Sequence, residues 1–178
     1  MKKGSLFWIL GPTSSGKTTI GKAYMRYLQE LLLPSIHFDG DEFRSILGSS
    51  LGIEPEDRFK NVSLCLHMAN KCIDSGFNVV VSALTAHDKA RQYVYKNAKN
   101  LVVIYLECPL EVCMQRDSRD LYHKAETGEI KPSSVVGLKT PYLVPDSPDI
   151  LLRTDKLSVE KSVEAIHHWF LGNRDQAS

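Results

Sequence analysis

A glycine-rich stretch near the start of the chain has the residue types and spacing of a phosphate-binding loop. It reads GPTSSGKTT over residues 11–19 and follows an apolar run at 6–10. The stretch matches the pattern G-x-x-x-x-G-K-S/T through Gly11, Gly16, Lys17 and Thr18. In such loops backbone N–H groups converge on phosphate oxygens, the lysine reaches the β- and γ-phosphates, and the hydroxyl ligates Mg²⁺. The sequence therefore predicts an ATP site that also includes Ser14, Ser15 and Thr19, with Thr18 as the Mg²⁺ ligand.

A second polar cluster, FDGDEFR at 38–44, comes at the end of another apolar run. A small kinase must hold the acceptor hydroxyl in line with the γ-phosphate, accept or orient its proton, and bind the anionic part of the acceptor with arginines. Asp39, Asp41 and Arg44 could supply these functions at the carboxyl edge of a parallel sheet, beside the glycine-rich loop. The alternative interpretation makes Asp41 a helix N-cap and Asp39 a turn residue.

Short apolar runs alternate with longer amphipathic segments along the chain. The runs predict five buried parallel strands at 6–10, 35–39, 77–82, 101–106 and 150–152. Apolar residues three and four apart predict crossover helices at 17–32, 55–74, 88–98, 110–116 and 158–170. This alternation predicts an α/β fold, a three-layer sandwich of the P-loop NTPase type, in one domain across residues 1–178. Ligands would bind beyond the carboxyl ends of the strands.

The segment 117–148 is predicted to be a lid, because it has Gly128, Gly137 and four prolines and no sustained period. Cations in and beside it could close over the transferring phosphoryl group and exclude water; they are Arg116, Arg119, Lys124 and Lys131. A solvated loop is the alternative.

Composition excludes several classes of partner. Lys and Arg total 22 and Asp and Glu total 21, so a net charge of +1 predicts no nucleic-acid partner and no attraction to a membrane. The apolar run at 6–10 is too short for a signal peptide or a membrane span, which predicts a cytoplasmic protein. The four cysteines fit neither a zinc site nor a CxxC pair and are interpreted as reduced packing residues. The histidines His67, His87, His167 and His168 are interpreted as packing or surface residues, because phosphoryl transfer by positioning requires no histidine.

Six stretches together resemble the adenylylsulfate kinases, which phosphorylate adenosine 5′-phosphosulfate on its 3′-hydroxyl. They read GPTSSGKTT, FDGDEFR, EDRFKN, ECPLEVCMQRD, LYHKAETGEIK and TPYLVPDSPDILLRTD, and they cover nearly the whole chain. The resemblance implies ATP- and Mg²⁺-dependent transfer to the 3′-hydroxyl of a small nucleotide with an acidic 5′ group. Because members of this family often form dimers, a homodimer is one option.

The resemblance also implies roles for individual residues. Asp41 is the candidate base, and Arg58 and Asn61 match the pair that holds the phosphosulfate. The implied catalytic set is Lys17, Asp41, Arg58 and Thr85. The implied acceptor-binding set is Asp39, Asp41, Arg44, Ile53, Arg58, Asn61, Leu84, Arg119 and Lys131, while Arg116 and Thr154 join the loop on the ATP side.

The chain departs from the family pattern at several positions. The two family phenylalanines that clamp the acceptor adenine are absent, because LGFS reads LGIE at 51–54 and GEIKGFTGID reads GEIKPSSVVGL from 128. Each lost ring could remove about 1–3 kcal/mol of base stacking. A different acceptor, such as cytidine diphosphoramidate, therefore stays open, as does an inactive nucleotide-binding regulatory module. A family lysine is replaced by Arg119.

At the end of the third predicted strand the chain reads SALTAH over 82–87, where the family has Ser-x-Ile-Ser-Pro-Tyr. Thr85 stands where the family has a serine sometimes described as phosphorylated. Direct in-line transfer needs no such covalent intermediate.

Overall fold

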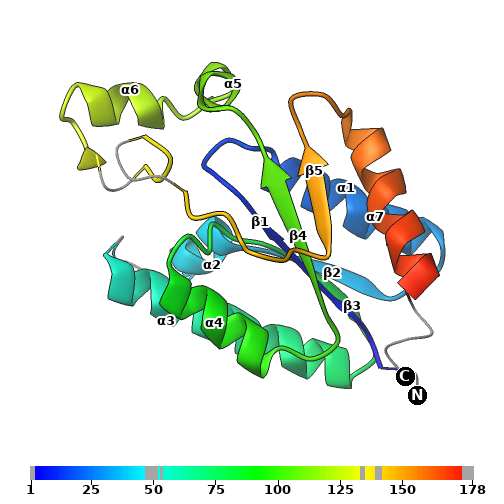
Figure 1. Ribbon diagram of the computed structural model, residues 1–178. Coiled ribbons are helices and arrows are strands. Elements are labelled where there is room, and N and C mark those ends of the chain that lie inside the picture. Colours follow the sequence, from blue (N-terminus) through cyan, green and yellow to red (C-terminus); the bar gives the residue numbers. More distant parts are fainter. Residues whose placement is uncertain (1–2, 47–51, 53, 133–134, 139–141, 174–178) are drawn as a thin grey trace.

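The computed structural model describes residues 3–46, 52, 54–132, 135–138 and 142–173. Five parallel strands form one sheet in the order β2-β3-β1-β4-β5, with β1 at its centre (Figure 1). The strands are β1 (Leu6–Leu10), β2 (Ser35–Asp39), β3 (Asn78–Ser82), β4 (Leu101–Glu107) and β5 (Ile150–Arg153). Because all five run in the same direction, their carboxyl ends share one edge of the sheet.

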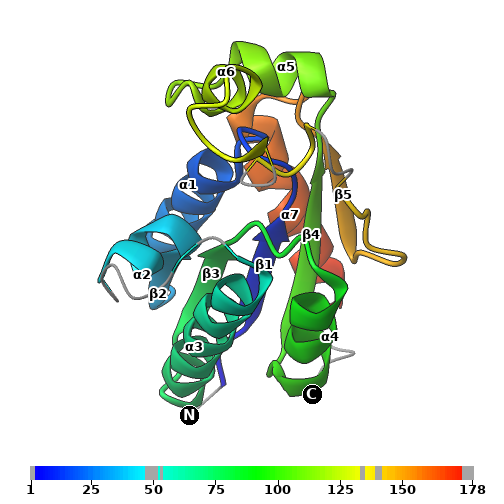
Figure 2. The same cartoon turned by 90° about the vertical axis from the view of Figure 1, so that its left-hand side faces the viewer.

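Helices cover both faces of the sheet (Figure 2). The covering helices are α1 (Lys17–Glu30), α3 (Pro55–Asp74), α4 (Asp88–Asn97) and α7 (Val159–Asn173). The burial of β1 on both faces explains why its sequence is apolar at every position. Leu6, Trp8 and Leu10 pack into the core formed with α3 and α4, whereas Phe7 and Ile9 pack into the core formed with α1 and α7. A strand buried on both faces has no solvent-facing side. The predicted three-layer α/β sandwich is confirmed.

Two short helices were not predicted, α2 (Gly40–Ile46) and α6 (Leu121–Glu126). Neither is long enough to show a helical period in the sequence. Helix α2 begins directly after β2, because Asp39 Oδ1 accepts hydrogen bonds from the amides of Asp41 at 2.9 Å and Glu42 at 3.3 Å. Asp39, rather than Asp41, therefore caps this helix. Since α6 lies within 117–148, the prediction that this segment lacks regular structure is wrong for these residues.

Most other elements end within a few residues of the predicted limits, and α3 matches them. Helix α1 stops at Glu30, because Leu32 takes the left-handed conformation with φ 58° and the Leu33 amide bonds back to the Leu28 carbonyl. Strand β3 begins at Asn78, because the amide of Phe77 bonds to the Cys72 carbonyl in the turn that ends α3. The short helix α5 (Leu110–Gln115) ends one residue early, and α7 continues three residues further than predicted.

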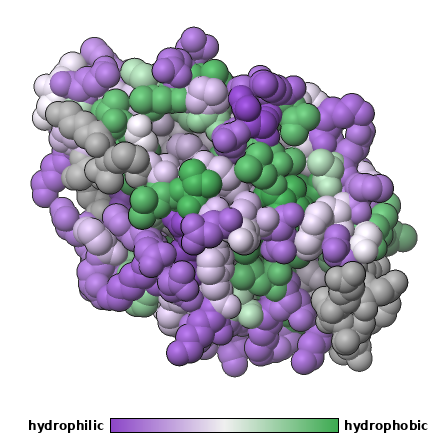
Figure 3. Space-filling view, in the orientation of Figure 1, coloured by the Kyte–Doolittle hydropathy of each residue, from purple (hydrophilic) through white to green (hydrophobic). Residues whose placement is uncertain are grey.

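The molecular surface is mixed in character. On the face shown in Figure 3, apolar side chains form separate patches among polar ones, as on most proteins. None of the described helices is long and apolar enough to cross a membrane.

Candidate active site

A cavity of about 690 Å³ lies at the carboxyl edge of the sheet. Its walls come from the glycine-rich loop, the junction of β2 and α2, the first turns of α3, the segment after β3 and the start of the lid segment, residues 117–148. Most of the predicted site residues lie in these walls, namely Ser14, Gly16, Lys17, Thr18, Thr19, Asp39, Asp41, Arg44, Arg58, Asn61, Leu84, Thr85, Arg116 and Arg119. Gly11, Ser15, Thr154 and Lys131 do not line it, and Ile53 lies outside the described residues.

Two glycines shape the loop that precedes α1. Gly16 has φ 96°, a conformation that L side chains rarely adopt. A Cβ atom on Gly11 would come within 2.7 Å of the Leu106 carbonyl oxygen, so the loop could not lie this close to β4 with a larger residue. The Ser15 hydroxyl is buried and has no hydrogen-bond partner among the described residues. The loop therefore holds a buried polar atom with no partner among the described residues.

Lys17 and Thr18 stand at the start of α1 and connect the loop to its surroundings. The Lys17 ammonium donates to the Pro12 carbonyl. Desolvation lowers the pKa of Lys17 to about 8, although Asp41 and other nearby acidic groups oppose this. Thr18 Oγ1 donates to Asp39 Oδ2 at 2.6 Å, so the loop meets the end of β2 directly.

Thr18 and Asp39 place a hydroxyl and a carboxylate side by side in the cavity wall. Mg²⁺ prefers oxygen ligands and is usually held by one or two carboxylates together with substrate phosphates. Within the described part of the chain no group of three or more His, Cys, Asp or Glu side chains could hold a metal ion. The donors present therefore fit Mg²⁺ bound with a nucleotide and do not form a metal site of their own.

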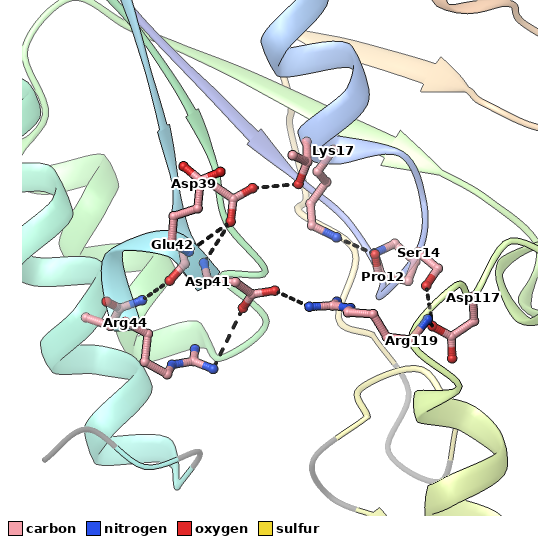
Figure 4. A network of polar contacts seen from close by, with 12 residues as sticks. Pro12, Ser14, Lys17, Asp39, Asp41, Glu42, Arg44, Asp117 and Arg119 are labelled. Carbon is pink, nitrogen blue, oxygen red and sulfur yellow. Dashed lines mark hydrogen bonds and ion pairs between the residues drawn. The ribbon is translucent and has the colours of Figure 1, made fainter. Parts of the chain in front are cut away.

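Asp41 lies between two arginines from different elements. Its carboxylate accepts a hydrogen bond from Arg119 Nη1 at 2.8 Å, and its other oxygen lies 3.8 Å from Arg44 Nη1 (Figure 4). Burial raises the pKa of Asp41, but the hydrogen bond and charge of Arg119, followed by Arg44 and Lys17, outweigh burial and lower this pKa overall. Asp41 is therefore ionised at neutral pH, as is needed to orient a hydroxyl group.

Helix α3 contributes Arg58 and Asn61, which face the cavity three residues apart. Burial and the nearby Arg44 lower the pKa of Arg58. Asn61 Nδ2 donates to the Gly40 carbonyl at 2.9 Å and so supports the start of α2. The other amide atom, Asn61 Oδ1, has no hydrogen-bond partner among the described residues.

The segment after β3 forms another wall and is held from two sides. Thr85 has φ 41°, which is rare for a β-branched residue. Its hydroxyl accepts a hydrogen bond from Trp8 Nε1 at 3.0 Å, within the buried core. The Leu84 carbonyl accepts one from the Tyr142 hydroxyl at 2.8 Å. Sequence reasoning gave no sign of these two contacts, because the partners lie far apart in the chain.

The lid segment is tied to the glycine-rich loop through residues that sequence reasoning missed. Asp117 Oδ1 accepts from Ser14 Oγ at 3.3 Å, and Asp117 Oδ2 accepts from the Tyr122 amide at 2.9 Å. The Tyr122 hydroxyl donates to the Thr13 carbonyl at 2.9 Å. Tyr122 also belongs to a small apolar cluster with Cys108, Cys113, Ala125 and Val135. The stretch RDSRDLY carries both residues, but only the fold shows what they contact.

The remaining predicted residues lie around this centre. Arg116 Nη2 donates to the Thr154 carbonyl at 2.9 Å, which joins the residue that ends α5 to the residue after β5. Lys131 pairs with Glu54 at 3.0 Å, on the surface and away from the cavity walls. All four cysteines are free, and burial raises the pKa of Cys65 and Cys113 to about 12.

His87 also lines the cavity, although the sequence suggested a packing or surface role. Its position at the end of SALTAH, just after a strand, was the available signal, because ligands bind beyond the carboxyl ends of parallel strands. The same cavity is also lined by small apolar side chains, namely those of Ala83, Ala86 and Ala90.

Comparison with known proteins gives consistent matches. The family model described as adenylylsulphate kinase matches residues 3–153. The adenylyl-sulfate kinase of Clostridium acetobutylicum is 34% identical over 166 residues, covering 93% of this chain and 82% of that protein. The adenylyl-sulfate kinase of Chloroflexus aurantiacus is 36% identical over 163 residues, covering 92% and 87%. The structure of the Mycobacterium tuberculosis APS kinase in complex with AMPPNP and APS aligns with a TM-score of 0.88 at 27% identity, covering 96% of this chain and 99% of that one.

Proposed function

The chain belongs to the adenylylsulfate kinase family, and we propose on this basis that it transfers the γ-phosphoryl group of ATP to the 3′-hydroxyl of adenosine 5′-phosphosulfate. The product would be 3′-phosphoadenosine 5′-phosphosulfate, PAPS. One observation carries the proposal: the glycine-rich loop and the acidic and basic residues after β2 face the same cavity, in contact through Thr18 and Asp39. The structure of the similar M. tuberculosis enzyme is a complex with AMPPNP and APS.

On the ATP side, the loop would hold the phosphates. Lys17 and the amides at the start of α1 would neutralise charge that develops on the phosphoryl oxygens. Thr18 and Asp39 would hold Mg²⁺, which neutralises charge on the β- and γ-phosphates when it is bound. Arg116, anchored on Thr154, would complete the nucleotide side of the cavity.

On the acceptor side, Arg44, Arg58 and Asn61 would position the nucleotide through its acidic 5′ group. The 3′-hydroxyl oxygen forms a bond to the γ-phosphorus, while the bond from that phosphorus to the bridging oxygen of ADP breaks. Asp41 orients the hydroxyl and takes its proton. Arg119 lies 2.8 Å from Asp41, so a cation of the lid segment would stand beside the reacting groups.

One observation favours a second candidate acceptor. Among the described residues that line the cavity there is no Phe, Tyr or Trp, and both clamping phenylalanines of the family are absent from the sequence. The same chemistry on a cytidine nucleotide with an acidic 5′ diphosphate, such as cytidine diphosphoramidate, would not need the adenine clamp.

The test is a steady-state transfer assay with MgATP on adenosine 5′-phosphosulfate and, in parallel, on cytidine nucleotides with an acidic 5′ diphosphate. Preference for the phosphosulfate would support the first candidate, and preference for the cytidine acceptor would support the second. ATP hydrolysis without acceptor gives the background rate. Transfer to neither acceptor above this background would contradict both.

We also propose that residues 1–178 form one domain and that the protein forms a homodimer of the kind common in this family. Sedimentation velocity of the whole chain would measure its mass in solution and so test the second.

A further inference from the structure

His87 lies in the cavity wall, and its side chain makes no hydrogen bond to the residues that the structure describes. It is the N-cap residue of α4, yet its side chain makes no capping hydrogen bond. Its ring forms no hydrogen bond to any residue in the described part of the chain, and the ring is only half-buried. Among the described residues, therefore, no partner competes with a bound molecule for either ring nitrogen.

The surroundings of His87 indicate which part of a ligand would reach it. Ala86 and Ala90 flank it and carry no polar side-chain atoms, so they offer the ring no competing partner. Arg58 lines the same cavity, and burial together with the positive charge of Arg58 lowers the pKa of His87. The imidazole is therefore neutral at neutral pH, with one N–H donor and one acceptor nitrogen.

We propose that His87 determines acceptor specificity by donating a ring N–H hydrogen bond to the acidic 5′ group of the acceptor, next to Arg58. This rests on the proposed function, in which Arg58 binds that group. A phosphosulfate or a substituted diphosphate presents several oxygens, and hydrogen bonds to such anionic groups are among the strong ones. A neutral donor adds one such bond without the repulsion that a second cation beside Arg58 would bring.

The same ring could instead stack on the acceptor base, and two substitutions separate these roles. His87→Gln keeps a side-chain N–H donor and removes the ring, whereas His87→Phe keeps an aromatic ring and removes the donor. His67→Gln, at an exposed position on α3, is the matched control. Each variant would be assayed with MgATP and with the acceptor that the wild type prefers.

We expect His87→Phe to lower kcat/KM for the acceptor about ten-fold or more, mainly through KM, with KM for MgATP unchanged. His87→Gln should stay within about three-fold of the wild type. Wild-type behaviour of His87→Phe would overturn the proposal, as would equal losses in both variants. Retained activity in His87→Phe with loss in His87→Gln would also overturn it and would indicate base stacking.

A second measurement separates a ligand contact from a structural effect. Calorimetric binding of adenosine 5′-phosphosulfate and of AMP, which lacks the sulfate, gives the preference for the full 5′ group. This preference should fall in His87→Phe, and an unchanged preference would contradict the proposal. If the wild type prefers the cytidine acceptor, its nucleotide and CMP form the corresponding pair. Absence of transfer by the wild type would contradict the proposed function itself, whereas an active wild type with unaffected His87 variants would contradict only the role of His87.

Discussion

Replacing Asp41 by Asn tests the centre of the proposed mechanism with the smallest change in shape. The substitution keeps the side-chain size but removes the charge that faces Arg119 Nη1 at 2.8 Å and Arg44 Nη1 at 3.8 Å. It also leaves no carboxylate to orient the acceptor hydroxyl or to take its proton. Asp39 keeps its hydrogen bonds to the α2 amides, so the start of that helix should stay in place.

The structure indicates a small effect on stability and a large one on turnover. The Asp41 side chain is 58% exposed and that of Arg119 is 55% exposed, and ion pairs at such sites contribute about 0.2–1 kcal/mol. General base catalysis, by contrast, typically contributes about 10²–10⁴-fold to the rate. We therefore expect kcat to fall by about 10²–10⁴-fold, with KM for MgATP nearly unchanged and Tm lowered by only a few degrees.

The assay is the transfer reaction with the preferred acceptor, together with thermal melting and nucleotide binding for each protein. Glu42→Gln is the matched control, because Glu42 neighbours Asp41 on α2 and pairs with Lys22 at 2.9 Å on the surface. In the wild type, the lowered pKa of Asp41 predicts that the step depending on its ionised form stays active until the pH falls below the ordinary aspartate value of 3.8. Turnover of Asp41→Asn within about three-fold of the wild type would refute the assigned role.

Four further predictions follow from other contacts. Lys17→Met should lower kcat/KM by orders of magnitude in the same assay. Folding lowers the pKa of Lys17 from 10.5 to about 8, so between pH 8 and pH 10.5 the unfolded chain binds more protons than the folded protein. The contribution of Lys17 to the free energy of unfolding should therefore rise over this pH range. Urea unfolding of the wild type should show this rise, and Lys17→Met should lack it. Trp8→Phe removes the donor to the Thr85 hydroxyl, so urea unfolding should show a loss of about 1–3 kcal/mol of stability. Kinetics should show a raised KM for the acceptor, and an unchanged KM would mean that this bond does not position the cavity wall after β3. Tyr122→Phe removes the hydrogen bond between the lid segment and the Thr13 carbonyl, which should destabilise this attachment by about 0.5–1.5 kcal/mol. Amide hydrogen exchange in α6 should become faster, and unaltered exchange there would contradict the assigned role of Tyr122.

Much of the architecture could be predicted from the sequence, because it depends on patterns within short stretches. The run LFWIL is apolar at each position, as a strand buried on both faces must be. The spacing of the glycine-rich loop predicts phosphate binding because an apolar strand precedes the loop and a helix follows it. Helix α3 was predicted at its observed limits, because 20 residues give a clear period. Helices α2 and α6 were missed, since six or seven residues span fewer than two turns.

The contacts of the candidate site could not be predicted in this way, because they join residues far apart in the chain. Thr18 and Asp39 are separated by 21 positions, Trp8 and Thr85 by 77, and Asp41 and Arg119 by 78. Residue types and local spacing predicted the presence of a phosphate loop, two acids and several arginines. Only the parallel sheet, by bringing the carboxyl ends of its strands to one edge, decided that Asp39 meets Thr18. The packing of the lid segment decided that Arg119 reaches Asp41 while Lys131 pairs with Glu54 on the surface.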